Sequence, residues 1–378
     1  MLICAANVYK GRTGERYPPA VSSKQADTAA DRLDGGGSKP SSLRQVAELA
    51  GVSVATASRV MSGSSHPVSE LTRQRVLSAA DRLAFQPNRL ARALVTARSQ
   101  TIGVIVHDIS DPYFGDIVKG LEDGIQAEDY RLFVASSMRD PEKELDYVRA
   151  LLAHQVDAIV FAASSIIDPD YIETLQTLMR RFRSRGGVVV TLSDHVIEGF
   201  RVIFDNDRAV ADMVGYLAER GHRRIGYIGG PPELEVSRVR LAGFTGAVAR
   251  LELESGSDHV AEGGFTVTGG GAAVAELLAR VEVTAVLAAN DLMAIGAMRH
   301  LLDSGVTVPD QVSVAGLDDI AIAEYGPVPL TTMRVPTYEM GKLGASILLD
   351  ALGSGEPADV VVAGAIIERD SVRSITVL

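Results

Sequence analysis

Residues 42–60 read SLRQVAELAGVSVATASRV, and this stretch decides the fold of the N-terminal part of the chain. Ser42 is followed three positions later by glutamine, the spacing of a capping box that begins a helix. Gly51 can end that helix, because glycine readily adopts the left-handed conformation found after a last helical turn. Ser53 can cap a second helix only two residues later. Two short helices joined through glycine predict a helix-turn-helix.

A third helix is predicted farther along the chain. It can begin at Ser69, and Pro87 limits its extent, because proline disfavours the helical conformation of the residue before it. Together the three helices make residues 41–86 one small helical module. The apolar side chains expected on the inner face of the third helix are Val76, Leu77, Ala80 and Leu83.

Charge separates this module from the rest of the chain. The 378 residues carry a net charge of −11, yet residues 41–100 contain eight arginines against three acidic residues, a net charge of +5. Residues 1–40 add +2, so residues 101–378 carry −18. A small basic module joined to a large acidic one is typical of a protein with a separate nucleic-acid-binding domain.

The basic module resembles a known family. Residues 43–60 are similar to the headpiece of the lactose-repressor/galactose-repressor family of bacterial regulators, and residues 87–94, PNRLARAL, resemble the hinge helix of that family. The resemblance extends over about residues 42–378. It implies a helix-turn-helix DNA-binding headpiece at 41–86 and a hinge helix at 87–98.

In such a headpiece, the second helix lies in the major groove of DNA. The resemblance implies that the operator is read at Val54 and Ala55, because these two positions vary with the operator in the family. Neither side chain can donate a hydrogen bond, so they would read thymine methyl groups and DNA shape, while Arg59 suits a bidentate contact with guanine. The alternatives are an ordinary helix surface for Val54 and Ala55 and a phosphate contact for Arg59. The remaining candidates for phosphate or base contacts are Ser53, Thr56 and Ser58.

The hinge is too short to be stable as an isolated helix in water. It needs its twin from a second subunit together with DNA, which predicts a homodimer on a near-palindromic operator. The resemblance implies that Leu94 is a wedge inserted between base pairs in the minor groove, and the alternative is packing within the pair of hinge helices. Asn88 and Arg89 are further candidates for DNA contacts.

Buried strands alternate with amphipathic helices from Thr101 onward. This alternation predicts doubly wound parallel sheets, and about 280 residues are enough for two of them with a cleft between. The core resembles the periplasmic-binding-protein fold of the same family, which implies that the chain crosses between the lobes near Phe204, Val335 and Val360. The expected lobes are 101–203 with 336–360, and 204–335 with 361–378. The expected strands are 102–106, 131–135, 157–161, 187–191, 224–228, 285–288 and 312–316, and the expected first helices are 116–127 and 141–155.

Ligands of such sheets bind beyond the carboxyl ends of the parallel strands. Carboxylate, amide and guanidinium groups presented together at that edge suit a polyhydroxylated ligand such as a sugar. Asp291 and Asp319 are interpreted instead as helix caps. For two of the candidates there are alternatives, a salt bridge between the lobes for Arg240 and a purely structural core position for Phe114. The candidate effector-binding residues are Asp111, Phe114, Asp194, Arg240, Asn290 and Asp318.

Several other classes of protein are disfavoured. A single cysteine, Cys4, excludes an intramolecular disulfide and a multi-cysteine zinc site, and the seven histidines lack metal-ligand spacing. We find no catalytic motif and expect neither an enzyme nor a bound metal or cofactor. No apolar run of about 18 residues predicts a membrane span. Residues 1–40 are predicted to be a disordered tail, and their apolar start is too short for a signal peptide, which favours a cytoplasmic protein.

The sequence therefore predicts a ligand-responsive transcription regulator, a homodimeric repressor controlled by a sugar. One alternative keeps DNA binding but replaces the signal with a nucleobase-type corepressor, or makes the protein a global regulator. A different class, a sugar-binding transport protein, fits the core alone but does not explain the basic headpiece. An enzyme of doubly wound fold is the least favoured class.

Overall fold

The structure is a computed structural model in which two compact units can be distinguished, Met1–Asn88 and Arg89–Leu378. The residues it describes are 41–61, 66–85 and 98–375. Several predictions lie outside the described residues, namely those for the tail 1–40 and for Asn88, Arg89 and Leu94 of the hinge.

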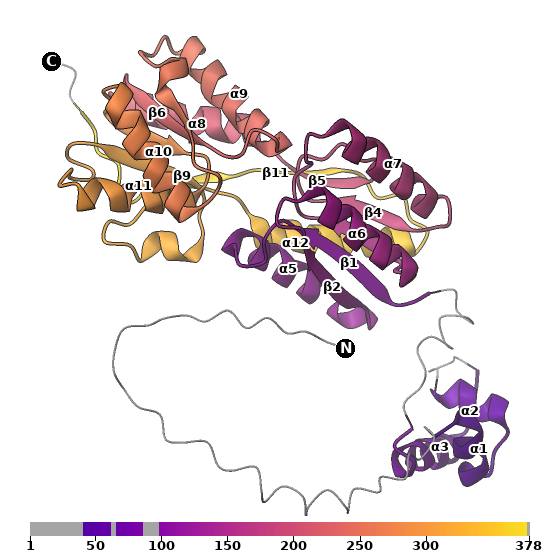
Figure 1. The fold of residues 1–378 in the computed structure, drawn as a ribbon. Helices are drawn as coiled ribbons and strands as arrows, with labels where there is room; N and C mark the ends of the chain where they lie inside the picture. The colour runs from indigo at the N-terminus through magenta and orange to yellow at the C-terminus, as the bar shows by residue number, and fades with distance from the viewer. Residues whose placement is uncertain (1–40, 62–65, 86–97, 376–378) are drawn as a thin grey trace, which may run out of the picture. The chain divides into compact units, whose positions relative to one another are not determined.

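The first unit contains the three predicted helices (Figure 1). The capping box is present: the Ser42 side chain accepts from the backbone N–H of Gln45, whose own side chain accepts from the Ser42 backbone at 2.8 Å. Gly51 follows the first helix with a φ of 64°, in the left-handed region. The third helix ends at Arg82, several residues before Pro87. The helices are α1 Leu43–Ala50, α2 Val54–Met61 and α3 Glu70–Arg82.

The inner face of α3 differs from the prediction at one position. Val76 and Ala80 are buried in the core of the module, but Leu77 is 45% exposed and Ala79 is buried in its place. Successive helical residues are rotated by about 100° around the helix axis. Val76, Ala79 and Ala80 therefore lie on the same face of α3, and Leu77 lies outside it. Apolar character alone placed Leu77 on the wrong side.

The second unit contains two sheets with helices packed on them, parallel except for one antiparallel edge strand in the second sheet, and the predicted fold class is confirmed (Figure 1). In the first lobe the strand order is β11-β5-β4-β3-β1-β2, with α5 packed on α12 and α6 packed on α7. Strands β1, β3 and β4 are buried on both faces, which explains their unbroken apolar runs. The elements of the first lobe are β1 Thr101–Val106, α5 Pro112–Ile125, β2 Arg131–Ser136, α6 Pro141–Ala153, β3 Ala158–Phe161, α7 Pro169–Arg183, β4 Val188–Thr191, β5 Phe200–Phe204, α12 Thr337–Leu352 and β11 Val360–Val362.

In the second lobe the strand order is β12-β10-β9-β8-β6-β7. Helix α8 packs on α9, and α10 packs on α11. The carboxyl ends of its central strands, β8 and β9, face the same edge of the sheet because the strands are parallel. The elements of the second lobe are α8 Asn206–Glu219, β6 Ile225–Gly229, α9 Glu235–Arg250, β7 Val260–Glu262, α10 Val267–Arg280, β8 Ala285–Ala288, α11 Asp291–Asp303, β9 Ser313–Asp318, the short helix η4 Ala321–Glu324, β10 Thr331–Arg334 and β12 Ala365–Ile367.

The chain crosses between the lobes three times: after β5, between β10 and α12, and between β11 and β12. Two of the expected bounds shift as a result. Phe204 ends β5 and belongs to the first lobe, and residues 361–362 also belong there, because β11 pairs with β5. The crossing expected near Val360 therefore lies at 363–364.

The first helix of the core begins earlier than predicted. It starts at Pro112 rather than near residue 116, because the Asp111 side chain accepts from the backbone N–H of Tyr113 at 3.0 Å and proline occupies the first helical position. The strands that were not predicted are β5, β7, β10, β11 and β12. Within the described residues, no helix is long and apolar enough to cross a membrane.

Candidate functional site

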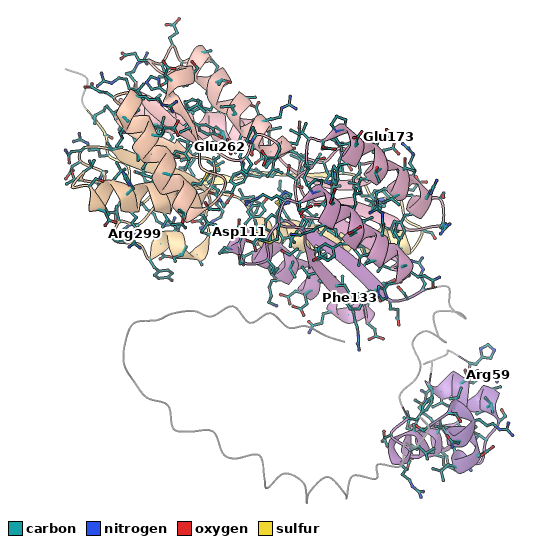
Figure 2. The ribbon with its side chains drawn as sticks, viewed as in Figure 1. Arg59, Asp111, Phe133, Glu173, Glu262 and Arg299 are labelled. Carbon is teal, nitrogen blue, oxygen red and sulfur yellow. The ribbon has the colours of Figure 1, made fainter. Side chains whose placement is uncertain are left out.

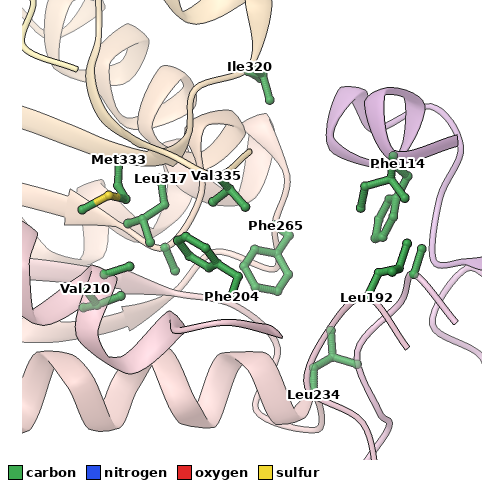
Figure 3. Close-up of a cluster of buried hydrophobic side chains, with 14 of the residues drawn as sticks. Phe114, Leu192, Phe204, Val210, Leu234, Phe265, Leu317, Ile320, Met333 and Val335 are labelled. Atoms are coloured by element: carbon green, nitrogen blue, oxygen red, sulfur yellow. The ribbon is translucent and has the colours of Figure 1, made fainter. Parts of the chain in front are cut away.

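A pocket lies between the two lobes of the second unit, beyond the carboxyl ends of the strands. It has an empty volume of about 580 Å³, part of which is open to solvent. Its wall in the first lobe comes from the residues after β1 and from the first turn of α5, and its wall in the second lobe comes from α8, α9 and the ends of β8 and β9. Figure 3 shows two apolar walls facing each other, with Phe114 and Leu192 on one side and Phe204 and Phe265 on the other.

Five of the six candidate effector-binding residues line this pocket. The first lobe contributes Asp111 and Phe114 (Asp111 is labelled in Figure 2). The residues that line it from the second lobe are Arg240, Asn290 and Asp318. Asp194 does not line the pocket; it lies behind Asn206, whose side-chain amide donates to the Asp194 carboxylate at 2.9 Å.

Asp318 is the buried carboxylate at the end of β9. Its side chain is 6% exposed and forms an ion pair with Arg240 at 3.5 Å. Burial raises the pKa of Asp318 well above its ordinary value, and the neighbouring Arg240 guanidinium opposes that shift. The φ of Asp318 is 116°, a conformation that L-residues rarely adopt, and such strain is most often kept where a side chain must be aimed at a ligand.

Arg240 is held entirely within the second lobe. Besides Asp318, its guanidinium donates to the side-chain oxygen of Asn206 at 2.8 Å and, in a very short contact, to the backbone carbonyl of Ala289. All of these partners belong to the second lobe, so the alternative of a salt bridge between the lobes is wrong. Asn206 in turn reaches Asp194 of the first lobe, so one amide links the polar groups of both lobes.

The predicted caps at the ends of β8 and β9 are wrong. Asn290, not Asp291, caps α11, because its side chain accepts from the backbone N–H of Met293 at 2.9 Å. Asp291 is fully buried and accepts instead from the Thr332 hydroxyl at 2.5 Å, and burial raises its pKa to about 7. Asp319 caps no helix either, since its carboxylate pairs at 2.7 Å with two arginines. These are Arg334 and Arg369.

Asp111 and Phe114 each combine a structural role with a place in the wall. Asp111 caps α5, and burial raises the pKa of its carboxyl. Phe114 is only 7% exposed and meets the rings of Tyr113 and His107 edge-on, with centroid distances of 5.2 Å and 6.0 Å. It is therefore both a core side chain and part of the pocket wall.

His107 lines the pocket and was missed by the sequence analysis. It is 4% exposed, and neither ring nitrogen has a well-formed hydrogen bond among the described residues. Burial and the nearby charge of Arg139 lower its pKa to about 3, opposed by the Ser164 backbone, so the ring is neutral. A neutral imidazole has one donor and one acceptor, and a single backbone group can satisfy only one of them. At least one nitrogen thus has no hydrogen-bond partner among the described residues.

Further contacts join the lobes beside the pocket, in addition to the hydrogen bond between Asn206 and Asp194. Residues Ile166 and Leu234 form a single β-bridge, and the backbone N–H of Ile167 donates to the Glu233 carbonyl at 2.7 Å. Elsewhere Arg139 donates to the Gly264 carbonyl at 3.1 Å, and its guanidinium carbon lies 5.6 Å from the ring centre of Phe265. The two lobes are therefore in direct contact at residues that border the pocket.

The helix-turn-helix presents its candidate DNA contacts on one exposed surface. Val54 is 47% exposed, and Ala55, Ser58 and Arg59 are exposed beside it. Arg59 is labelled in Figure 2. The Ser53 hydroxyl caps α2 by accepting from the backbone N–H of Thr56 at 3.1 Å, and the two hydroxyls lie 2.9 Å apart.

Each of the two units is similar to known proteins. Residues 42–88 match the model of bacterial regulatory proteins of the lacI family, and residues 214–372 match a periplasmic binding protein-like domain. The transcriptional regulator GalS of Salmonella typhimurium is 34% identical over 81% of this chain and 88% of its own length. The transcriptional regulator GalR of Escherichia coli is 35% identical over 83% of this chain and 90% of its own length.

Solved structures give the same result. A lac repressor dimer bound to operator and the anti-inducer ONPF has a TM-score of 0.76 and 26% identity, covering 89% of this chain and 100% of that one. A complex of the transcriptional regulator CelR with cellobiose has a TM-score of 0.64 and 31% identity, covering 88% of this chain and 99% of that one. The chain therefore belongs to the lacI family of bacterial regulatory proteins, which are DNA-binding transcriptional regulators and not enzymes.

Proposed function

We propose that the protein is a repressor whose affinity for its operator is set by a neutral sugar bound in the pocket between the lobes. The observation that carries this proposal is the composition of the wall. The carboxylates of Asp111 and Asp318 and the amides of Asn206 and Asn290 face the pocket, and the rest of its surface includes aromatic and aliphatic side chains. Vicinal hydroxyls are matched by Asp and Asn oxygens, and the apolar face of a sugar ring stacks on aromatic rings.

The first lobe would hold the sugar through Asp111 and His107, and the second lobe through Asn290 and Asp318. A neutral His107 suits a hydroxyl, because a hydroxyl can donate and accept at once. Similar proteins support a sugar, since one solved structure is a complex of CelR with cellobiose and another, of a regulator from Enterococcus faecium, has bound ribose. A nucleobase, which would also meet aromatic rings and amide groups, is the competing ligand.

The headpiece would bind the operator through α2, with two copies of the chain on a near-palindrome. Exposed apolar side chains on the core support a homodimer. Phe133 and Val134 on the edge strand β2 are 53% and 40% exposed, and Ile322 and Tyr325 by η4 are 56% and 78% exposed (Phe133 is labelled in Figure 2). Apolar side chains gathered at an edge strand usually mark a contact surface. Because bacterial DNA is in the cytoplasm, the protein would act there.

Ligand control requires that the sugar bind the open and closed lobe arrangements unequally. A sugar held by Asp111 of one lobe and Asp318 of the other favours closure. In a dimer, closure would move the two points, one in each subunit, at which the core is connected to the headpiece. The same coupling can release the operator or strengthen its binding, according to the direction of that movement.

The test compares Asp318→Asn with the wild-type protein. Calorimetry with a panel of neutral monosaccharides, disaccharides and nucleosides identifies the ligand, and operator binding is then measured with and without it. We expect a sugar to bind, and Asp318→Asn to lose the ligand response while ligand-free operator binding is nearly unchanged. Asp303→Asn, at an exposed position at the end of α11, is the control and should respond normally. Binding of nucleosides alone, or a normal response in Asp318→Asn, would refute the sugar site.

A further inference from the structure

The end of the first lobe that lies away from the pocket carries a concentration of arginines. Helix α7 begins three residues after Ile166, which bridges to the second lobe, and runs for 15 residues, about 22 Å. Its last turn therefore lies far from the pocket, at the end where β1, β3 and β4 begin. The arginines in and just after that last turn are Arg180, Arg181, Arg183 and Arg185.

Two of these arginines line a second cavity. Arg181 and Arg185, together with Arg98, line a space of about 1480 Å³, part of which is open to solvent, and Gly186 and Gly187 also line it. Arg98 is anchored there, because its guanidinium donates to the Leu352 carbonyl at 2.6 Å. The cavity is thus a basic recess at the residue where the chain enters the core.

The charges of Arg181 and Arg185 are not neutralised within the part of the chain that the structure describes. Their neighbours are engaged: Arg183 pairs with Glu198 at 2.7 Å, and Arg180 donates to the Thr177 hydroxyl at 3.0 Å. No described carboxylate or acceptor bonds the guanidinium groups of Arg181 and Arg185, both of which are exposed. Unpaired guanidinium groups beside a recess suit an anion with several oxygens, which a planar fork binds in a bidentate manner.

One carboxylate lines this recess, and it is already satisfied. Both oxygens of Asp157 accept from the backbone at the start of β1, from Ser99 at 2.9 Å and from Gln100 at 2.8 Å. Its role is to fix the segment that leads into the core. The recess therefore keeps a net positive character although the core as a whole carries −18.

A short segment of the chain connects this recess to the DNA-binding module. Twelve residues, 86–97, separate Phe85 of the headpiece from Arg98, and even a fully extended chain would span at most about 45 Å. A tether of this length allows this end of the core to reach DNA that the headpiece holds. Because the core carries a net charge of −18, it can approach DNA without repulsion only where positive charge faces the phosphates.

We propose that Arg181 and Arg185 bind backbone phosphates of the DNA that the helix-turn-helix holds, so that the effector core contributes directly to DNA affinity. The contribution is independent of base sequence, because phosphates carry no sequence information. The inference rests on the DNA-binding function of the family. It adds a second DNA-contacting surface outside the headpiece.

The test uses the full chain and the double substitution Arg181→Gln/Arg185→Gln. The matched control, Arg208→Gln/Arg299→Gln, removes the same charge from exposed helix positions of the second lobe (Arg299 is labelled in Figure 2). The probes are a duplex recovered by in vitro selection with the wild-type protein and a scrambled duplex. Anisotropy gives the affinity for each between 50 and 200 mM salt.

We expect the first double variant to bind both duplexes about tenfold more weakly at low salt. Its slope of log affinity against log salt should be smaller by about 2, since each lost phosphate contact removes about 0.9. The control should retain the wild-type slope. Arg181→Lys/Arg185→Lys keeps the positive charges but removes the planar guanidinium groups. It should retain the wild-type salt slope and lose less DNA affinity than the Gln variant.

Equal slopes for the wild type and both Gln variants would overturn the proposal. A second result would also overturn it: the wild type binds inorganic phosphate, and Arg181→Gln/Arg185→Gln loses that binding but keeps the wild-type DNA slope. The recess would then be a site for small anions. A wild-type protein that selects no duplex would instead contradict the DNA-binding function itself. Melting temperatures of both Gln variants close to that of the wild type establish that they are folded.

Discussion

The two units keep their candidate binding residues in opposite environments. On the headpiece, Val54, Ser58 and Arg59 are exposed at the surface of α2, whereas in the core Arg240 and Asp318 are almost fully buried and bonded to their own lobe. DNA must be met on an open surface, while a small ligand is gripped best where water is excluded. It follows that substitutions in the headpiece can alter DNA binding alone. Substitutions in the pocket alter both ligand binding and the free energy of unfolding of the core.

The largest expected effect comes from separating the two units. A chain of residues 98–378 should lose at least about 10³-fold in affinity for the selected operator, because the base contacts are all assigned to the headpiece. It should keep its ligand affinity, since every residue that lines the pocket lies within 98–378. Anisotropy and calorimetry measure the two quantities. Operator affinity within tenfold of the full chain would break the division of roles.

Substitution of the buried arginine should have the next largest effect. Arg240→Ala leaves the Asp318 carboxylate buried without its cation and removes the donors to Asn206 and Ala289. The free energy of unfolding of the core should fall by about 3–5 kcal/mol. Urea unfolding measures it, and Arg299→Ala is the control, because that side chain is 79% exposed and should change stability by no more than about 0.5 kcal/mol. Equal losses in the two variants would contradict the buried network.

Substitution of the exposed arginine should show the opposite pattern. Arg59→Ala should weaken binding to the selected operator by about 1–3 kcal/mol and relax the preference at one base pair. Its free energy of unfolding should stay within about 0.5 kcal/mol of the wild-type value. Operator and scrambled duplexes are compared in the same assay. An equal loss on both duplexes would make Arg59 a phosphate contact rather than a base contact.

The smallest expected effect is a pH dependence of the free energy of unfolding of the core, caused by His107. The pKa of His107 is lowered from 6.5 to about 3 in the folded protein, so below pH 6.5 the unfolded chain binds more protons than the folded one. The stability from neutral His107 is complete above pH 6.5 and is lost as the pH falls toward 3, by about 1.4 kcal/mol per unit. Between pH 7 and 5.5 the wild type should therefore lose about 1.4 kcal/mol more than His107→Gln. Urea unfolding at both pH values checks this, and parallel losses would mean that His107 titrates normally.

The sequence predicts the headpiece closely because its signals are local. Ser42, Gly51 and Ser69 cap or end helices through bonds to residues only a few positions away, and all three act as predicted. In the core the alternation predicts two sheets, but β11 and β12 are three residues long and pair with strands far away in the sequence. Their valines and isoleucines favour a strand, but three residues are too few to show the periodicity that distinguishes a strand from a loop.

The errors in the pocket have the same origin. Asn and Asp are equally good helix caps, so the pair Asn290 and Asp291 does not reveal which residue caps α11. The decision comes from Thr332, whose hydroxyl meets Asp291 across the sheet. His107 follows β1 directly and satisfies the same rule that selected the carboxylates, but only its burial without partners distinguishes it from an ordinary core histidine.

The three crossings between the lobes also determine when each part of the chain can fold during synthesis. The headpiece can fold once the residues of α3 have left the ribosome, but both sheets of the core lack an edge strand until β11 and β12 have been synthesised. A chain that ends before Val360 would thus carry a complete headpiece on two unfinished lobes. Such a fragment would retain the elements that recognise the operator without the intact pocket that senses the ligand. Premature termination or proteolysis near the C-terminus would therefore uncouple the DNA-binding headpiece from control by the ligand.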